Sequence, residues 1–354
     1  MKLKPLQIGE LTARLPIIQG GMGIGVSLSG LAGAVAKEGG VGVLSAAQPG
    51  FDEPDFSENT TEANLRALER EIKRAKETAD GNGLIGVNIM CALRNYKEYV
   101  QCCIKSGADL IISGAGLPTS LPELVEGSKI KFAPIVSSLK AVKVLFKLWS
   151  RRYKTVSDMV VIEGPMAGGH LGFAVEEVDK DDFSDYDREV SSIIEYVRGF
   201  EEPFGKRIPV VVAGGVYDRA DIDHYLALGA DGVQMSTRFV ATEECDADIR
   251  FKEAYVNAKK EDIAIVKSPV GMPGRAIRNA FIREREKSKE RIQKCYHCLE
   301  HCDPSAIPYC ITGALVRAVR GDVENGLVFC GANAWRVNRI MPVKELMAEL
   351  AGES

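Results

Sequence analysis

The sequence predicts an α/β fold, a (β/α)8 TIM barrel with a helical, cysteine-rich C-terminal extension. Short runs rich in Val, Ile and Leu alternate with amphipathic stretches, which is the pattern of strands alternating with helices. Eight such runs occur, and each is apolar throughout, as strands covered on both faces are. The 354 residues exceed the roughly 250 that such a barrel needs. A doubly wound open sheet is the competing arrangement.

The expected elements follow one another regularly along the chain. The eight strands are expected at residues 16–19, 41–46, 84–90, 109–113, 132–137, 159–163, 209–213 and 232–236. The helices between them include residues 62–79, 96–106, 139–153, 188–200 and 219–228. Gly107 and Gly229 come just before a new strand, where glycine commonly ends a helix.

Two segments interrupt this alternation. Residues 172–186, after the sixth strand, are acidic and are expected to form a loop near the barrel mouth. From residue 241 onward the chain is charged, has helical periodicity and carries most of the cysteines. We therefore expect a barrel over residues 1–240 and a helical extension over residues 241–354 packed on it, because no Pro/Ser-rich linker separates them.

Composition narrows the classes of partner. The net charge of −4 provides no basic field for nucleic acid or a membrane surface. No apolar run approaches the roughly 18 residues of a spanning helix, and the N-terminus lacks the apolar stretch of a signal peptide. We expect a cytoplasmic protein with a small-molecule substrate, whose cysteines are thiols or metal ligands. A homodimer is compatible with such barrels, although the sequence does not fix the assembly.

The loops after the last two strands predict a phosphate site, because barrels often bind phosphate there. Gly214 and Gly215 follow the seventh strand, and their backbone N–H groups can approach a phosphate closely. The eighth strand ends in hydroxyl-bearing residues within the run Gln234, Met235, Ser236 and Thr237. The alternative is a pair of tight turns with no ligand.

Three further strand ends carry candidate site residues. The loop after the first strand, with Gln19, Gly20, Gly21 and Met22, is flat enough for a planar ring to lie against main chain, or is only a strained turn. Asn88 lies at the end of the third strand, and the sixth is followed by Glu163, Gly168, Gly169 and His170. His170 is the leading catalytic candidate because imidazole titrates near neutrality and can hold a proton. The alternative is a loop histidine that only bonds the backbone.

Together these loops resemble the nitronate monooxygenase family, formerly called 2-nitropropane dioxygenases, which is similar to the FMN-dependent enoyl-acyl-carrier-protein reductases. The resemblance covers roughly residues 8–280 and rests on five segments in matching order, at residues 16–22, 86–88, 163–170, 209–215 and 232–239. It implies FMN as cofactor, with the phosphate on the loops at 214–215 and 236–237. Asn88 and the loop at 19–22 would approach the isoalloxazine ring, and His170 would lie near it.

The resemblance implies more than one activity. In nitronate monooxygenases the histidine would abstract the α-proton of a nitroalkane or stabilise a nitronate, and the reduced flavin would meet oxygen. In the reductase relatives, hydride passes from NAD(P)H through FMN to an enoyl thioester. A flavin-binding protein without turnover is a third alternative. The chain departs from the family at Ser236, where Gly is more usual, and in having no Gln at residues 172–185.

Four cysteines lie close together outside the family's common core. Cys295, Cys298, Cys302 and Cys310 form a C-x2-C-x3-C-x7-C run, with His297 and His301 as possible alternative ligands. Thiolates at such spacing can hold an iron–sulfur cluster or zinc, although standard zinc sites favour two separated C-x2-C pairs. The alternative is a helical tail with small core cysteines. An iron–sulfur centre would favour an electron-transfer reductase over a monooxygenase.

Overall fold

The computed structural model describes residues 2–178 and 185–353 and contains a closed barrel of parallel strands. Its strands are β3 (Ile17–Gln19), β4 (Val41–Ser45), β5 (Leu84–Met90), β6 (Leu110–Gly114), β7 (Lys131–Val136), β8 (Val160–Glu163), β10 (Val210–Ala213) and β11 (Gly232–Met235). Because β10 pairs with both β8 and β11, the sheet has no edge. The predicted barrel is confirmed, and the open sheet is excluded.

An N-terminal hairpin closes one end of the barrel. It consists of β1 (Leu6–Ile8) and β2 (Leu11–Ala13), which pair antiparallel. Leu6, Ile8 and Ala13 are buried and pack with apolar side chains of the barrel interior, such as Ile112 and Val161. The hairpin therefore fills the interior beneath the strands, so that a ligand site is left to the opposite, carboxyl end.

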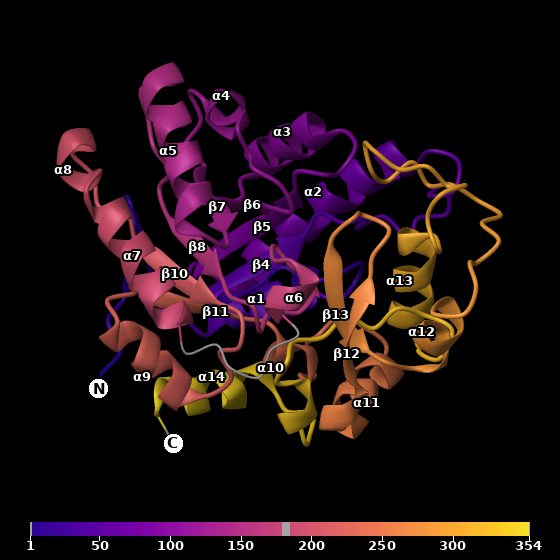
Figure 1. Cartoon of the computed structure of the whole chain (residues 1–354). Coiled ribbons are helices and arrows are strands. Elements are labelled where there is room, and N and C mark those ends of the chain that lie inside the picture. Colours follow the sequence, from indigo (N-terminus) through magenta and orange to yellow (C-terminus); the bar gives the residue numbers. More distant parts are fainter. Residues whose placement is uncertain (1, 179–184, 354) are drawn as a thin grey trace.

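Helices cover the outside of the barrel, as Figure 1 shows. They are α1 (Ser29–Lys37), α2 (Thr60–Ala79), α3 (Tyr96–Ser106), α4 (Leu121–Val125), α5 (Leu139–Arg152), α7 (Tyr186–Arg198), α8 (Glu201–Phe204), α9 (Arg219–Ala227) and α10 (Thr237–Val240). The short α6 (Val175–Val178) lies instead in the loop after His170, beside the C-terminal hairpin (Figure 1). The five expected helices all form, with ends shifted by a few residues. The acidic segment at 172–186 contributes α6 and the start of α7, and its residues 179–184 lie outside the described residues.

The C-terminal region is helical, and it also contains a β-hairpin that the sequence did not reveal. Its elements are α11 (Ile249–Asn257), η1 (Lys260–Asp262), β12 (Ile263–Lys267), β13 (Pro273–Ile277), α12 (Ala280–Arg285), α13 (Ile311–Val319), η2 (Ala334–Arg336) and α14 (Val343–Ala351). β13 pairs with β12 and also with the two-residue strand β9 (Gly169–His170), which follows β8. The hairpin thus reaches the predicted site.

The last helix completes the layer of helices around the barrel. α14 contacts α1, α9 and α10, and its Val343, Leu346, Met347 and Leu350 are buried. Figure 1 shows α14 beside α9, at the same side of the molecule as both chain ends. In the described part of the chain, no helix combines the length and apolar character needed to cross a bilayer.

Candidate active site

A cavity of about 390 Å³ opens at the carboxyl ends of the barrel strands. All eight strands contribute lining residues from their last positions or from the loop that follows, namely Gly21, Ser45, Asn88, Gly114, Ile135, Glu163, Ala213 and Gln234. Its volume lies within the roughly 300–1,000 Å³ of ordinary ligand sites. Apart from Gln19 and Gly20, every residue predicted from the sequence to bind a cofactor lines this cavity, as does His170.

The phosphate-type loops form one side of the cavity. Gly214 and Gly215 have φ values of +87° and +98°, a region that favours glycine. A Cβ on Gly214 would come within 2.7 Å of the Gly164 carbonyl oxygen, so the close approach also requires glycine. Ser236 and Thr237 line the same cavity. Glycine backbone and two hydroxyls therefore converge where the sequence predicted a phosphate.

The two ends of the glycine loop after β3 make different contacts. Gln19 is fully buried, and its amide exchanges hydrogen bonds with the backbone of Val43, at 3.1 and 3.2 Å. Gln19 and Gly20 do not line the cavity, which differs from the predicted contact, because the amide is used to anchor the loop to β4. Gly21 does line it, and a Cβ there would meet Asn88 Cβ at 2.5 Å. Only glycine lets this backbone lie against Asn88.

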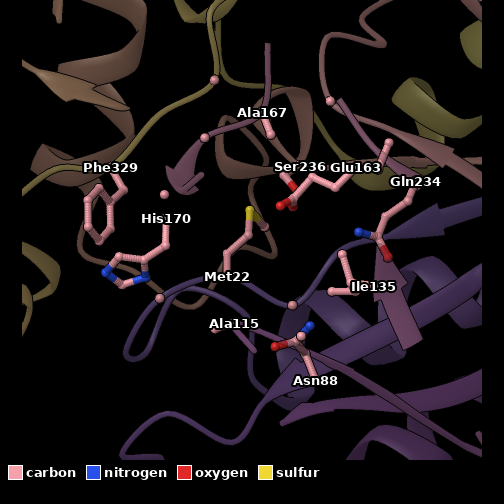
Figure 2. Close-up of a pocket in the computed structure, with 18 of the residues that line it drawn as sticks. Met22, Asn88, Ala115, Ile135, Glu163, Ala167, His170, Gln234, Ser236 and Phe329 are labelled. Atoms are coloured by element: carbon pink, nitrogen blue, oxygen red, sulfur yellow. The ribbon is translucent and has the colours of Figure 1, made fainter. Parts of the chain in front are cut away.

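Two polar side chains that line the cavity, those of Gln234 and Glu163, are less hydrated than they would be in water. The Gln234 side chain is buried, and its Oε1 has no hydrogen-bond partner within the described residues. Burial raises the pKa of Glu163 to about 7. In Figure 2, Glu163, Gln234 and Ser236 lie at one side of the pocket, and His170 and Phe329 lie at the other. The unpaired amide oxygen of Gln234 is therefore available to accept a hydrogen bond from a ligand in the cavity.

His170 is held at the opposite side by the C-terminal region. Its strand β9 pairs with β13, which places His170 opposite Gly274. Nε2 lies 2.8 Å from the hydroxyl oxygen of Ser268, and the Phe329 ring packs edge-on at 5.0 Å between centroids. Burial lowers the pKa of His170 to about 4, so the imidazole is neutral at pH 7.

A buried arginine fixes the loop between β8 and β9. Arg275 of β13 is 5% exposed, and its Nη1 donates to the backbone carbonyls of Pro165, at 2.9 Å, and of Ala167. Burial lowers the pKa of this guanidinium. The charged guanidinium thus holds the loop that leads to His170. Hydrogen bonds from a charged donor are stronger than those between neutral groups.

Several site residues were not found by sequence reasoning. Ser268, Met272, Phe329, Cys330, Gly331 and Asn333 come from the C-terminal region and line the cavity or contact His170. Asn333 Nδ2 donates to the Gly215 carbonyl at 2.7 Å, which ties this region to the phosphate-type loop. These contacts join residues about a hundred positions apart, for which no periodicity or motif gives a signal.

The residues present fit FMN. The orphaned Gln234 Oε1 and Asn88 offer amide groups to a polar ring, and the Gly21 backbone offers it a flat surface. The backbone at Gly214 and Gly215, with two hydroxyls, suits a phosphate group. None of the lining residues in the described chain is a Lys or Arg, so phosphate binding would rest on backbone and hydroxyl donors. Arg238, next to Thr237, pairs instead with Glu349 at 2.9 Å.

The predicted metal ligands lie apart from this site. Cys295, Cys298, Cys302 and Cys310 belong to the segment between α12 and α13 and line a second, small cavity. Among residues 2–178 and 185–353, no three His, Cys, Asp or Glu side chains are grouped as ligands of one ion.

Comparison with known proteins gives consistent matches over most of the chain. The family model described as nitronate monooxygenase matches residues 4–353, beyond the expected 8–280 and across the cysteine segment. A probable nitronate monooxygenase of Staphylococcus saprophyticus is 25% identical, covering 92% of this chain and 89% of that protein. One from Staphylococcus aureus is 25% identical over 77% and 78%.

Solved structures show the same fold. FabK from Thermotoga maritima superposes with a TM-score of 0.70 at 26% identity, covering 96% of this chain and 92% of that one. Nitroalkane oxidase from Streptomyces ansochromogenes gives a TM-score of 0.69 at 21% identity, covering 96% and 95%. The second likeness, at this identity, bears on the fold alone.

Proposed function

The chain belongs to the nitronate monooxygenase family, and from this premise we propose that it is an FMN-dependent oxidoreductase that oxidises nitronates with molecular oxygen. The observation that carries the proposal is the neutral, partly buried His170, held by Ser268 across the cavity from the unpaired Gln234 amide oxygen. The relatives named probable nitronate monooxygenase support it.

FMN would be held by the residues that line the two sides of the cavity. The backbone at Gly214 and Gly215, with Ser236 and Thr237, would take the phosphate. Gly21, Met22, Asn88 and Gln234 would contact the ring. Bound FMN would supply the redox chemistry, accepting electrons from the substrate and passing them to oxygen. The protein supplies position, orientation and exclusion of water.

The low pKa of His170 favours one substrate form over another. A base whose pKa is about 4 is weak at pH 7, and proton abstraction is most efficient when the pKa lies near the working pH. A nitronate has already lost its α-proton, so His170 only has to orient it. The neutral ring can donate one hydrogen bond to the nitronate oxygens while Ser268 holds Nε2. We therefore infer that the nitronate is preferred over the neutral nitroalkane.

The proposal is tested by following the flavin spectrum without oxygen. FMN-loaded protein is mixed anaerobically with a nitronate, with the parent nitroalkane, with NADH or with NADPH. We expect the nitronate to bleach the flavin and air to restore it. Bleaching by a nicotinamide but not by the nitronate would overturn the proposal.

Two histidine variants show whether His170 acts in this step. His170→Ala should slow bleaching by about 100-fold or more while FMN content is unchanged. The matched control is His224→Ala, because His224 lies in α9, is half-exposed and pairs with Asp187 at 3.0 Å. An equal effect of the two substitutions would remove His170 from the mechanism. Flavin that no candidate substrate bleaches would favour a binding protein without turnover.

One observation favours a second candidate function, an NAD(P)H-dependent reduction of enoyl thioesters or other activated alkenes. FabK, whose structure aligns over 96% of this chain, is as similar in sequence as the probable nitronate monooxygenases. The same anaerobic experiment separates the two, since only the reductase requires flavin reduction by a nicotinamide.

A further inference from the structure

We propose that Cys295, Cys298, Cys302 and Cys310 bind a 4Fe–4S cluster next to the flavin cavity. The spacing suggested such a centre among several alternatives, and the structure adds where the four thiols lie and what surrounds them. Its test does not depend on which substrate the flavin site takes, but a cluster there would favour the second candidate function, the NAD(P)H-dependent reductase, over the monooxygenase.

The four cysteines line one small cavity. Its volume is about 30 Å³, and the cysteines lie in the part of the chain that joins α12 to α13. All four cysteines therefore face one space, although they span a loop sixteen residues long.

The arrangement of the thiols suits a cluster better than a single ion. Four thiolates around one zinc ion each lie about 2.3 Å from it, and within the described residues no three such side chains are grouped around one point. In a 4Fe–4S cluster each cysteine binds a different iron, so the thiolates lie further apart around a central core. The single run of cysteines, without two separated C-x2-C pairs, agrees with the cluster.

The surroundings suit an anionic cluster. The backbone N–H of His297 donates to Cys295 Sγ at 3.4 Å, and the backbone N–H of Gly313 donates to Cys310 Sγ at 3.5 Å. Such N–H donors stabilise cluster sulfurs and tune their potential. Cys310 also caps the N-terminus of α13, a nine-residue helix whose positive end favours a thiolate. Arg94 and Lys294 line the same cavity and bring positive charge.

Two short paths join the cysteine cavity to the flavin cavity. Along α13, Leu315 lines the flavin cavity and lies five residues after Cys310, a rise of about 7.5 Å. On the other side, Arg94 N donates to the Cys298 carbonyl at 3.1 Å, and Arg94 lies four residues beyond Met90, which lines the flavin cavity.

One apolar cluster fills the space between the two cavities. Cys298 and Cys302 pack against the same buried side chains as Leu315 and Phe329, and Phe329 contacts His170. A cluster held there would be separated from the flavin by packed protein rather than by water, which is the environment of an electron-transfer centre.

The test is chemical analysis of the full-length protein purified without oxygen and reconstituted with iron and sulfide. We expect about four iron and about four sulfide per chain, the composition of one 4Fe–4S cluster. Excess dithionite should produce the paramagnetic resonance signal of a reduced cluster, which fully reduced flavin does not give. Iron below about one per chain, zinc bound by the thiols, or a disulfide among them would each overturn the proposal.

Cysteine variants assign the site. Cys298→Ser and Cys302→Ser should lose most of the iron and the resonance signal and should keep FMN. Cys102→Ser is the matched control, because Cys102 is a half-buried cysteine of α3 outside both cavities. Iron loss in the control, or full retention in both test variants, would contradict the assignment. If the test variants fail to fold, the iron content and spectrum of the unaltered protein still decide the matter.

Discussion

Glu163 and His170 line the same cavity, and burial shifts their pKa values in opposite directions. Burial raises the pKa of Glu163 from 4.5 to about 7 and lowers that of His170 from 6.5 to about 4, because each is disfavoured in its charged form. The flavin-free cavity therefore prefers neutral groups. Glu163 ionises there only as the pH reaches about 7, and His170 stays neutral at that pH.

Glu163→Gln is expected to stabilise the flavin-free protein in a pH-dependent way. With a folded pKa above the unfolded one, Glu163 costs stability as pH rises from about 4.5 through 7, since the unfolded chain ionises first. Removing the charge should raise the free energy of unfolding by about 1–3 kcal/mol at pH 8 and by less at pH 5. Thermal unfolding at both pH values measures this, with Glu253→Gln, an exposed residue of α11, as control. A pH-independent effect would contradict it.

Among individual residues, those whose role depends on their place in a strand–loop pattern could be predicted from the sequence. Gly214, Gly215, Thr237 and His170 follow strands of a barrel, and barrel geometry brings strand ends together. Gln19 fits the same pattern, but its side chain hydrogen-bonds to the backbone of β4 instead. That orientation depends on local packing. The pattern predicts position and does not predict side-chain direction.

At the scale of elements, the strands were predictable because burial on both faces makes their sequences apolar throughout, as in β4 and β10. β9 was not, since it has two residues and forms only because β13 supplies its partner. That pairing joins segments a hundred positions apart, and Ser268 reaches His170 through it. Local sequence therefore could not reveal the second half of the site.

Arg275→Met tests whether Arg275 of β13 positions the strand that carries His170. The substitution leaves the carbonyls of Pro165 and Ala167 without their donor, so the loop that carries His170 should shift. We expect nitronate-dependent bleaching to slow by about 10- to 100-fold, the usual result of a small misplacement. Stability should change less, because removing a buried charge offsets the lost hydrogen bonds. Arg278→Met, on an exposed side chain paired with Glu286, is the control. Equal rates in both variants would show that the Arg275 hydrogen bonds are not needed for positioning.

At the scale of the whole molecule, the C-terminal region and the barrel share one apolar core. Phe239 and Met235 of the barrel pack in the same buried cluster as Leu346, Val337 and Val328. The sequence placed a boundary at residue 240, and α14 nevertheless returns to cover α1 and α9. Composition cannot show such a return, because helices that cover a barrel look alike wherever they occur in the chain.

The shared core predicts a single unfolding transition. The two tryptophans report on the two regions, because Trp149 is buried in α5 and Trp335 is partly exposed in η2. Each of the variants Trp149→Phe and Trp335→Phe keeps one tryptophan, whose fluorescence follows denaturant unfolding in its own region. In each variant, the midpoint measured by fluorescence should equal the midpoint measured by circular dichroism. Midpoints separated between fluorescence and circular dichroism would indicate that the regions unfold independently.

The hairpin that fills the base of the barrel also decides how the protein can be handled. Arg14, just before β3, forms an ion pair with Glu353 at 3.6 Å, so the C-terminal end lies at the filled base, and Figure 1 shows both chain ends at the same side of the molecule. A tag, a surface tether or a fused protein at either end would point away from the cavity mouth. The mouth stays free for small molecules in each of these formats.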